Sequence, residues 1–223
     1  TIFPDVVNSH DVVGALLPHI ADELGLPAGI PIVAGTADQP AQALGNGILQ
    51  ADRMSITLGS GGQIFVPVSD LDAVQVDERV HLFNHATGGW YVLGAMLSAG
   101  LALRWLRDVL GNSLSYAELE QLATTVPHGS EGLIFLPHLN GTRTPHMNAS
   151  ARGSFIGLTS RHTRGHLVRA VMEGVAYSIR EALDACRDNA PMMPQQIIGA
   201  GGGLQSPVWR QIIVDVLNYP IHT

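Results

Sequence analysis

The chain has 223 residues, 46% of them hydrophobic, so it is long and apolar enough to bury a core of its own. Its formal net charge of −7 at pH 7 argues against two partners, the phosphate backbone of a nucleic acid and a membrane surface. A nucleotide remains compatible with this charge, because a few backbone N–H groups and one metal ion can hold ATP.

The first half of the chain predicts a helix, a strand, a second helix and then a series of strands. Apolar residues recur at helical spacing over 12–24, and Gly25 and Pro27 follow as stop signals, so we expect a helix there. A second helix is expected from the turn at Gly35 to about Leu49. Strands are expected at 30–34, 54–58, 63–68, 81–86 and 90–93.

The second half of the chain predicts alternating helices and strands. Its longest pattern is an amphipathic helix over 164–189, with Thr163 as the N-cap. The stretch 137–151 is rich in Pro, Asn, Thr and Gly and predicts a loop. This order is typical of an α/β domain with a mixed sheet, and one domain is the simplest interpretation. Further helices are expected at about 98–110, 116–124 and 206–217, and strands at 132–136 and from Gln196.

Two apolar strands run straight into glycine clusters, Ser55-Ile-Thr-Leu-Gly-Ser-Gly-Gly62 and Gln196-Ile-Ile-Gly-Ala-Gly-Gly-Gly203. Glycines leave backbone N–H groups accessible without Cβ interference, a geometry that suits phosphate. The helix expected after the second cluster would add unpaired N–H groups at the same place. One glycine after a strand usually marks only a tight turn. Two such clusters, with an acid-bearing turn besides, predict a nucleotide-phosphate site.

Asp38 stands between a strand and a helix and is followed by Gln39 and Pro40, a residue suited to the first turn of a helix. In one interpretation Asp38 is the helix N-cap. In the other it carries chemistry, because an acid at the carboxyl end of a strand faces the crevice where open α/β sheets bind ligands. There Asp38 would accept a proton from a substrate hydroxyl, and Gln39 would hydrogen-bond a polyol.

Other conspicuous residues have structural interpretations. The spacings of His81, His85, His138 and His146 fit no compact zinc pattern, so we expect no metal site built by the protein. The three tryptophans are expected to be core or domain-face anchors, and Glu173 to fix the position of its helix, because it falls within a helical stretch.

The single cysteine, Cys186, excludes a disulfide framework, so a reducing cytosol is the default location. No apolar run reaches the roughly 18 residues of a membrane span, so we predict a cytoplasmic protein. The chain begins without methionine and stops just after an expected strand start, and we expect it to be cut from a longer protein.

Five segments together resemble one known family. Residues 153–173 resemble, position for position, the C-terminal signature of the FGGY carbohydrate kinases. Residues 34–39 are similar to the family's catalytic-aspartate turn, 58–62 to its second phosphate motif, and 201–211 to its adenosine motif. Gly141-Thr-Arg-Thr-Pro-His146 has the form of the xylulose-specific branch. The resemblance covers nearly the whole chain, in the order of the family.

This resemblance implies an actin-like, ribonuclease-H-like fold with the active site in a cleft between two domains. Residues 1–223 would then be the C-terminal, nucleotide-binding domain, with the catalytic turn near its front at about 30–50. The N-terminal sugar-binding domain, with its Asp-x-Gly-Thr loop, and the last C-terminal helix would be absent. We therefore expect the chain alone to be inactive.

The resemblance also assigns roles. Asp38 would take the proton of the sugar hydroxyl that attacks the γ-phosphate of MgATP, with Gln39 beside the sugar. Gly59, Ser60 and Gly61 would hold the transferring phosphate, and Ser60 keeps the hydroxyl of the family's threonine. The remaining ATP-binding positions would be Gly100 near the nucleotide (or a small residue for helix packing), Gly202 and Gly203 against adenosine, and Ser206, where relatives have an asparagine that reaches the purine.

The implied function is ATP-dependent phosphorylation of a sugar hydroxyl, with D-xylulose as the expected sugar and ATP and Mg²⁺ as cofactors. Another FGGY kinase, for glycerol or another pentulose, is the nearest alternative. A non-catalytic ATP-binding module of the actin-like superfamily is an alternative of a different class. A hydrolase built on Ser60 lacks a nucleophile-elbow motif and a matched His and Asp. The expected partners are a sugar, the missing domain and, as an open alternative, a second copy; no nucleic acid or membrane is expected.

Overall fold

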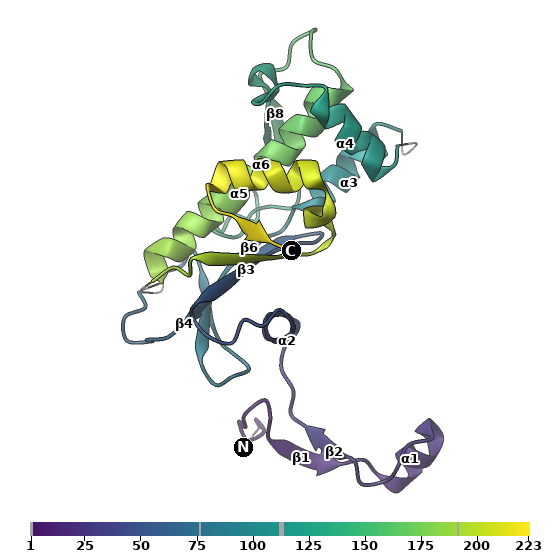
Figure 1. Ribbon diagram of the computed structural model, residues 1–223, viewed down its shortest axis with the longest axis vertical. Coiled ribbons are helices and arrows are strands. Elements are labelled where there is room, and N and C mark those ends of the chain that lie inside the picture. Colours follow the sequence, from purple (N-terminus) through teal and green to yellow (C-terminus); the bar gives the residue numbers. More distant parts are fainter. Residues whose placement is uncertain (1, 76, 112–113, 191) are drawn as a thin grey trace.

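The computed structural model describes residues 2–75, 77–111, 114–190 and 192–223 (Figure 1). Six strands form its central sheet: β3 (Arg53–Leu58), β4 (Gly62–Val68), β5 (His81–Asn84), β6 (Trp90–Met96), β9 (Gln196–Ala200) and β10 (Ile221–His222). Their order in space is β10-β9-β3-β4-β6-β5. β9 runs parallel to β10 and β3, while the other neighbours are antiparallel. The predicted α/β class with a mixed sheet is confirmed.

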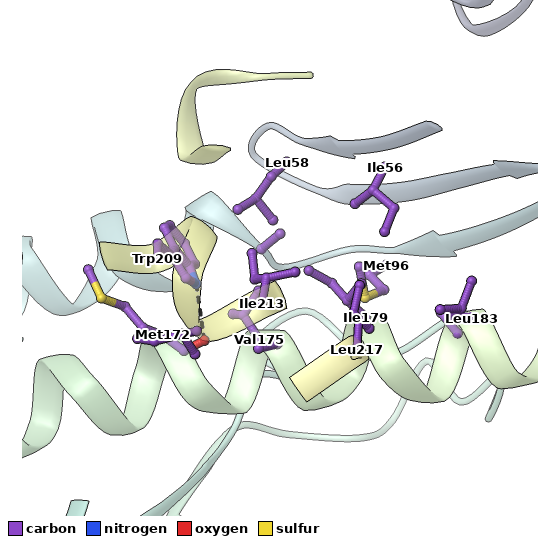
Figure 2. Packing of buried hydrophobic residues seen from close by; sticks show 14 of the residues in the cluster. Ile56, Leu58, Met96, Met172, Val175, Ile179, Leu183, Trp209, Ile213 and Leu217 are labelled. Carbon is purple, nitrogen blue, oxygen red and sulfur yellow. Dashed lines mark hydrogen bonds between the residues drawn. The ribbon is translucent and has the colours of Figure 1, made fainter. Parts of the chain in front are cut away.

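One face of the sheet is covered by helices and holds most of the core. Alternate side chains of β3 point to this face, among them Ile56 and Leu58. In Figure 2 they point toward the longest helix, and its Val175 and Ile179 belong to the same core cluster. The Nε1–H of the buried Trp209 donates to the carbonyl of Met172 at 3.0 Å (Figure 2). The helices are α3 (Gly100–Val109), α4 (Tyr116–Thr124), α5 (Arg164–Asn189) and α6 (Pro207–Leu217).

The opposite face carries a shorter helix, α2 (Asp38–Gly45), and a second small core. Ala43 of α2 and Ile48 just after it pack against Phe65, Tyr91 and Leu93 of β4 and β6. These strand residues alternate with those that face α5, so the two cores lie on opposite sides of the same strands. α2 ends earlier than predicted because Asn46 caps it and Gly47 has a φ of +69°.

The N-terminal elements lie apart from the sheet (Figure 1). β1 (Val12–Ala15) pairs antiparallel with β2 (Pro31–Val33), and α1 (Pro18–Leu24) lies between them in sequence. The helix predicted over 12–24 is therefore wrong in its first half. Adjacent β-branched valines favour an extended backbone there. The helix starts instead at Pro18, which has no N–H to lose in a first turn.

The long predicted helix is confirmed as α5, with the predicted bounds and with Thr163 at the N-cap. His166 Nδ1 accepts the backbone N–H of Thr163 at 3.0 Å. β7 (Ile134–Leu136) ends at the predicted loop, and the unpredicted β8 (Ser154–Ile156) returns from it to pair antiparallel with β7. Two short 3₁₀ turns complete the chain, η1 (Ser130–Gly132) and η2 (Gly202–Gln205).

A buried ion pair joins α5 to the loop before β7. Arg169 Nε donates to Glu173 Oε1 at 2.8 Å, and both side chains are 8% exposed. Glu173 Oε1 also accepts the N–H of Gly129 at 3.0 Å, while Arg169 Nη1 donates to the carbonyl of Val126 at 3.1 Å. Glu173 therefore has the structural role expected from its place in a helix.

The single cysteine, Cys186, is buried in α5 against the sheet. Burial raises the pKa of its thiol to about 12. The thiol is therefore protonated at neutral pH and is a poor nucleophile. None of the helices in the described ranges combines the length and the hydropathy that a membrane-spanning segment needs.

Replacing Glu173 by alanine should lower the free energy of unfolding by about 3–5 kcal/mol, because the Arg169 charge would stay buried without its partner. The matched control is Asp184→Asn, which breaks the pairs of Asp184 with Arg180 and Arg187 on the same helix, where all three side chains are about 40% exposed. That change should cost less than about 1 kcal/mol. Urea unfolding followed by tryptophan fluorescence measures both, and equal losses would contradict a special role of the buried pair.

Candidate functional site

A cavity of about 550 Å³ opens on the helical side of the sheet, where the two glycine clusters meet. It lies between the ends of β3 and β9 and the helices α3, α4 and α6. A cavity of this size is within the range of small-molecule and cofactor sites. Six of the nine residues predicted from the sequence line it together: Gly59, Ser60, Gly100, Gly202, Gly203 and Ser206.

The first glycine cluster forms the turn between β3 and β4. Leu58 pairs with Gly62, so Gly59, Ser60 and Gly61 make the turn itself. The start of α3 holds this turn: Gly100 N–H donates to the Gly59 carbonyl at 2.9 Å. A Cβ on Gly100 would lie 2.5 Å from that oxygen, so only glycine permits this approach. Gly100 therefore has the packing role considered for it and also lines the cavity, while its place near a nucleotide stays a prediction.

The second glycine cluster packs against the end of β3. Gly201 has a φ of +89°, and a Cβ there would lie 2.6 Å from the Leu58 carbonyl oxygen. A Cβ on Gly203 would lie 2.5 Å from Leu58 Cδ2, so contacts within the protein already require glycine at this position. Gly202 has no atom within 4 Å of such a Cβ. Of these three glycines, Gly202 alone lies against open space.

The N-terminus of α6 is capped by two side chains of the protein. Ser206 Oγ accepts the N–H of Trp209 at 3.1 Å, and Glu120 Oε1 of α4 accepts the N–H of Val208 at 2.9 Å. The prediction that this helix offers unpaired N–H groups to phosphate is therefore wrong for these two groups. Ser206 caps α6 and also lines the cavity.

The sequence analysis missed several polar residues that line the cavity. Arg104 lies one helical turn after Gly100 on α3, and this i,i+4 spacing is a signal that could have found it. Tyr116 starts α4, and the Arg107 guanidinium carbon lies 4.9 Å from the centre of its ring. Glu120 and Gln205 complete the polar lining. The cavity thus offers cationic, aromatic, anionic and amide side chains beside the glycine turns.

Asp38 and Gln39 lie outside this cavity, on the opposite face of the sheet. Ala37 is the N-cap of α2, so the N-cap interpretation of Asp38 is wrong. Asp38 is instead an exposed residue of the first turn, and its Oδ1 accepts the N–H of Gln39 at 2.8 Å. Burial raises the pKa of the Tyr91 hydroxyl, and the negative charge of Asp38 raises it further. Asp38 therefore stands near the small core formed by β4 and β6.

The loop 137–151 is joined to β6 at the same end of the sheet as the first glycine turn. Thr144 and Ala95 exchange two hydrogen bonds of 3.0 Å, through Thr144 N–H and Thr144 Oγ1. Arg143 Nη2 lies 2.8 Å from His81 Nε2.

Within the described part of the chain, no group of three or more His, Cys, Asp or Glu side chains could hold a metal ion.

Comparisons with known proteins all match carbohydrate kinases. Residues 54–223 match the FGGY family of carbohydrate kinases, C-terminal domain. The xylulose kinase of Bacillus subtilis is 36% identical over 218 residues, which cover 97% of this chain and 43% of that protein. The gluconokinase of the same species is 34% identical over 216 residues, 90% of this chain and 41% of that protein.

A solved structure, the xylulose kinase from Rhodospirillum rubrum, matches with a TM-score of 0.85 and 36% identity. The match covers 98% of this chain and 44% of that one. This likeness confirms the actin-like α/β fold expected from the sequence. The chain thus spans less than half the length of each of these relatives.

A pair of glycine substitutions tests the packing of the turns. Gly100→Ala should lower the free energy of unfolding by about 1–3 kcal/mol without ligand, because the new methyl group overlaps the Gly59 carbonyl. Gly202→Ala adds the same methyl group where the chain leaves open space, and should change stability by less than about 0.5 kcal/mol. Thermal unfolding compares the two variants. A stability loss for Gly202→Ala as large as for Gly100→Ala would contradict this geometry.

Proposed function

Because this chain belongs to the FGGY family of carbohydrate kinases, we propose that the protein containing it transfers the γ-phosphate of ATP to a sugar hydroxyl, with D-xylulose as the substrate. The observation that carries the proposal is the single cavity in which both glycine turns meet. It belongs to a chain whose similar relatives include several xylulose kinases. The loop Gly141–His146 favours the same sugar.

ATP would lie with its adenosine against Gly202 and Gly203 and its phosphates toward the turn Gly59–Gly61. The backbone N–H groups of this turn and the Ser60 hydroxyl would hold the transferring phosphoryl group. Arg104 would add a positive charge within the same cavity. Mg²⁺ would enter as part of the MgATP substrate, because this ion is usually bound through nucleotide phosphates and water.

Asp38 would act as the general base. The β3–β4 turn stands at the end of the sheet, between the cavity on one face and α2 on the other. A triphosphate that crosses this turn would bring its γ-phosphate toward the α2 side. There the Asp38 carboxylate would accept the proton of the attacking hydroxyl, and Gln39 would hydrogen-bond the sugar.

The remaining sugar contacts would come from the N-terminal domain that the longer relatives have room for. Large apolar side chains of the N-terminal elements are exposed in this chain and would pack there, among them Phe3, Val12, Leu24 and Ile32. We therefore propose that the chain alone is inactive. A cytoplasmic location would fit the need for ATP and the reduced, buried Cys186.

D-gluconate is the second candidate sugar, because a gluconokinase is 34% identical over 90% of the chain. A non-catalytic ATP-binding module is the alternative of another class. It would bind the nucleotide through the same cavity, but it would have no use for a base at Asp38.

The first test is ADP release by the full-length protein with MgATP and a panel of D-xylulose, D-gluconate, glycerol, L-ribulose and L-fuculose. We expect D-xylulose to be preferred at least about tenfold in kcat/KM. Preference for another sugar would change the proposed substrate and leave the proposed mechanism standing. ATP binding without transfer to any sugar would favour the non-catalytic module.

Asp38→Asn should lower kcat by several orders of magnitude and leave the Kd for ADP within about twofold, because Asp38 is outside the cavity. Initial-rate kinetics and calorimetric titration with ADP measure the two quantities. Full activity of this variant would disprove the role of Asp38 as the base.

A further inference from the structure

A hydrogen bond joins the helix that carries Asp38 to the strand that carries the phosphate turn. Thr57 Oγ1 of β3 donates to Gln42 Oε1 of α2 at 3.0 Å. We propose that Thr57 and Gln42 are a positioning pair, which holds the Asp38 carboxylate in register with the turn Gly59–Gly61. The inference rests on the proposed function, because it assigns these residues a role in that same transfer.

The two residues stand at short sequence distances from the groups that they would align. Thr57 precedes Gly59, the first residue of the turn, by two positions on β3. Gln42 follows Asp38 by four positions on α2, so both lie on one side of the helix. One hydrogen bond therefore connects the strand just before the phosphate site with the helix one turn after the base.

The strand is a firm reference for this alignment. Ile56 and Leu58, the neighbours of Thr57, are both fully buried in the main core on the α5 side. β3 is also paired on both edges, parallel to β9 and antiparallel to β4. Thr57 points to the other face because side chains alternate along a strand. The β3 backbone at Thr57 is therefore fixed from three sides.

The helix has fewer restraints. The strand before it in sequence, β2, pairs with β1 and does not join the central sheet. α2 buries Pro40 and Ala43, and Ile48 packs just past its end. Apolar burial of this kind is non-directional. A hydrogen bond depends steeply on distance and angle, so Gln42 supplies the directional restraint.

A second polar contact holds the other end of the segment. Thr87 N–H donates to His85 Nδ1 at 3.1 Å, so the other ring nitrogen of the neutral imidazole carries the proton. That Nε2–H donates to the Ile48 carbonyl at 3.1 Å. This contact lies ten residues beyond Asp38 and fixes the exit from α2. The Thr57–Gln42 bond is the one near the base.

A simpler role would be to satisfy two polar side chains between a helix and a sheet. The two roles differ in what they affect. A purely structural bond would change stability and substrate binding together. A positioning bond would change kcat and leave nucleotide binding alone, because the adenosine cavity lies on the opposite face of the sheet. A displacement of about 1 Å at a reacting group can cost about 100-fold in rate.

The test uses the full-length protein with its preferred sugar. Thr57→Val removes the hydroxyl at similar volume and should lower kcat about 10–100-fold, with KM for ATP and Kd for ADP within about twofold. Thr57→Ser keeps the hydroxyl donor, so its kcat should stay within about threefold of the wild type. Gln42→Leu should match Thr57→Val, and the double variant should be no slower than either single one, because both remove the same bond.

Ser55→Ala is the matched control, since Ser55 is buried on the same strand and face but two residues farther from the turn. Its kcat should stay within about twofold of the wild type. Hydrogen exchange gives a readout independent of catalysis: the backbone amides at the C-terminal end of α2 should exchange faster in Thr57→Val than in the control.

Wild-type kcat in Thr57→Val, or equal losses in kcat and ADP affinity, would overturn the inference and leave the proposed function standing. Additive losses in the double variant would also overturn it, because the residues would then act separately. A wild-type protein that phosphorylates no sugar would overturn both proposals at once.

Discussion

The alternation of side chains along β3 is the constraint on which the rest of the structure depends. Ile56 and Leu58 face the helices α5 and α6, while Thr57 between them faces α2. The same strand ends in the turn that both faces share. A shift of one residue in its register would bury Thr57 in the apolar core and turn Leu58 toward α2. The alternation of side chains along β3 thus determines both the core packing and the placement of the candidate site.

Close approach of backbone to backbone then builds the cavity. The start of α3 reaches the Gly59 carbonyl because residue 100 has no Cβ, and the second glycine turn reaches the Leu58 carbonyl for the same reason at Gly201. Most of these glycines are required by the protein's own packing before any ligand is considered. Two are exceptions, because Gly202 lies against open space and a Cβ on Gly59 would meet only the Gly61 carbonyl at 3.7 Å. A glycine-rich motif can therefore be necessary for a site without every glycine touching the ligand.

Local signals in the sequence predicted the elements that are long and capped, and failed where short segments depend on distant partners. α5 has a clear helical period and a cap at Thr163, and its bounds were predicted correctly. β8 has three residues and pairs across a loop with β7, so its sequence alone has no strand period to detect. Arg104 and Tyr116 resemble solvated helix residues until the fold brings α3 and α4 to one cavity. The glycine turns were found because a glycine cluster after a strand predicts a turn from the local sequence alone.

The double cap at the start of α6 has an electrostatic consequence. Glu120 uses one carboxylate oxygen to hold Val208 and lines the same cavity as the glycine turns. A carboxylate at that wall repels phosphate, whereas Arg104 within the same cavity attracts it. The residue that completes a helix cap therefore also places a negative charge in the wall of a cavity whose other charged lining residue is Arg104.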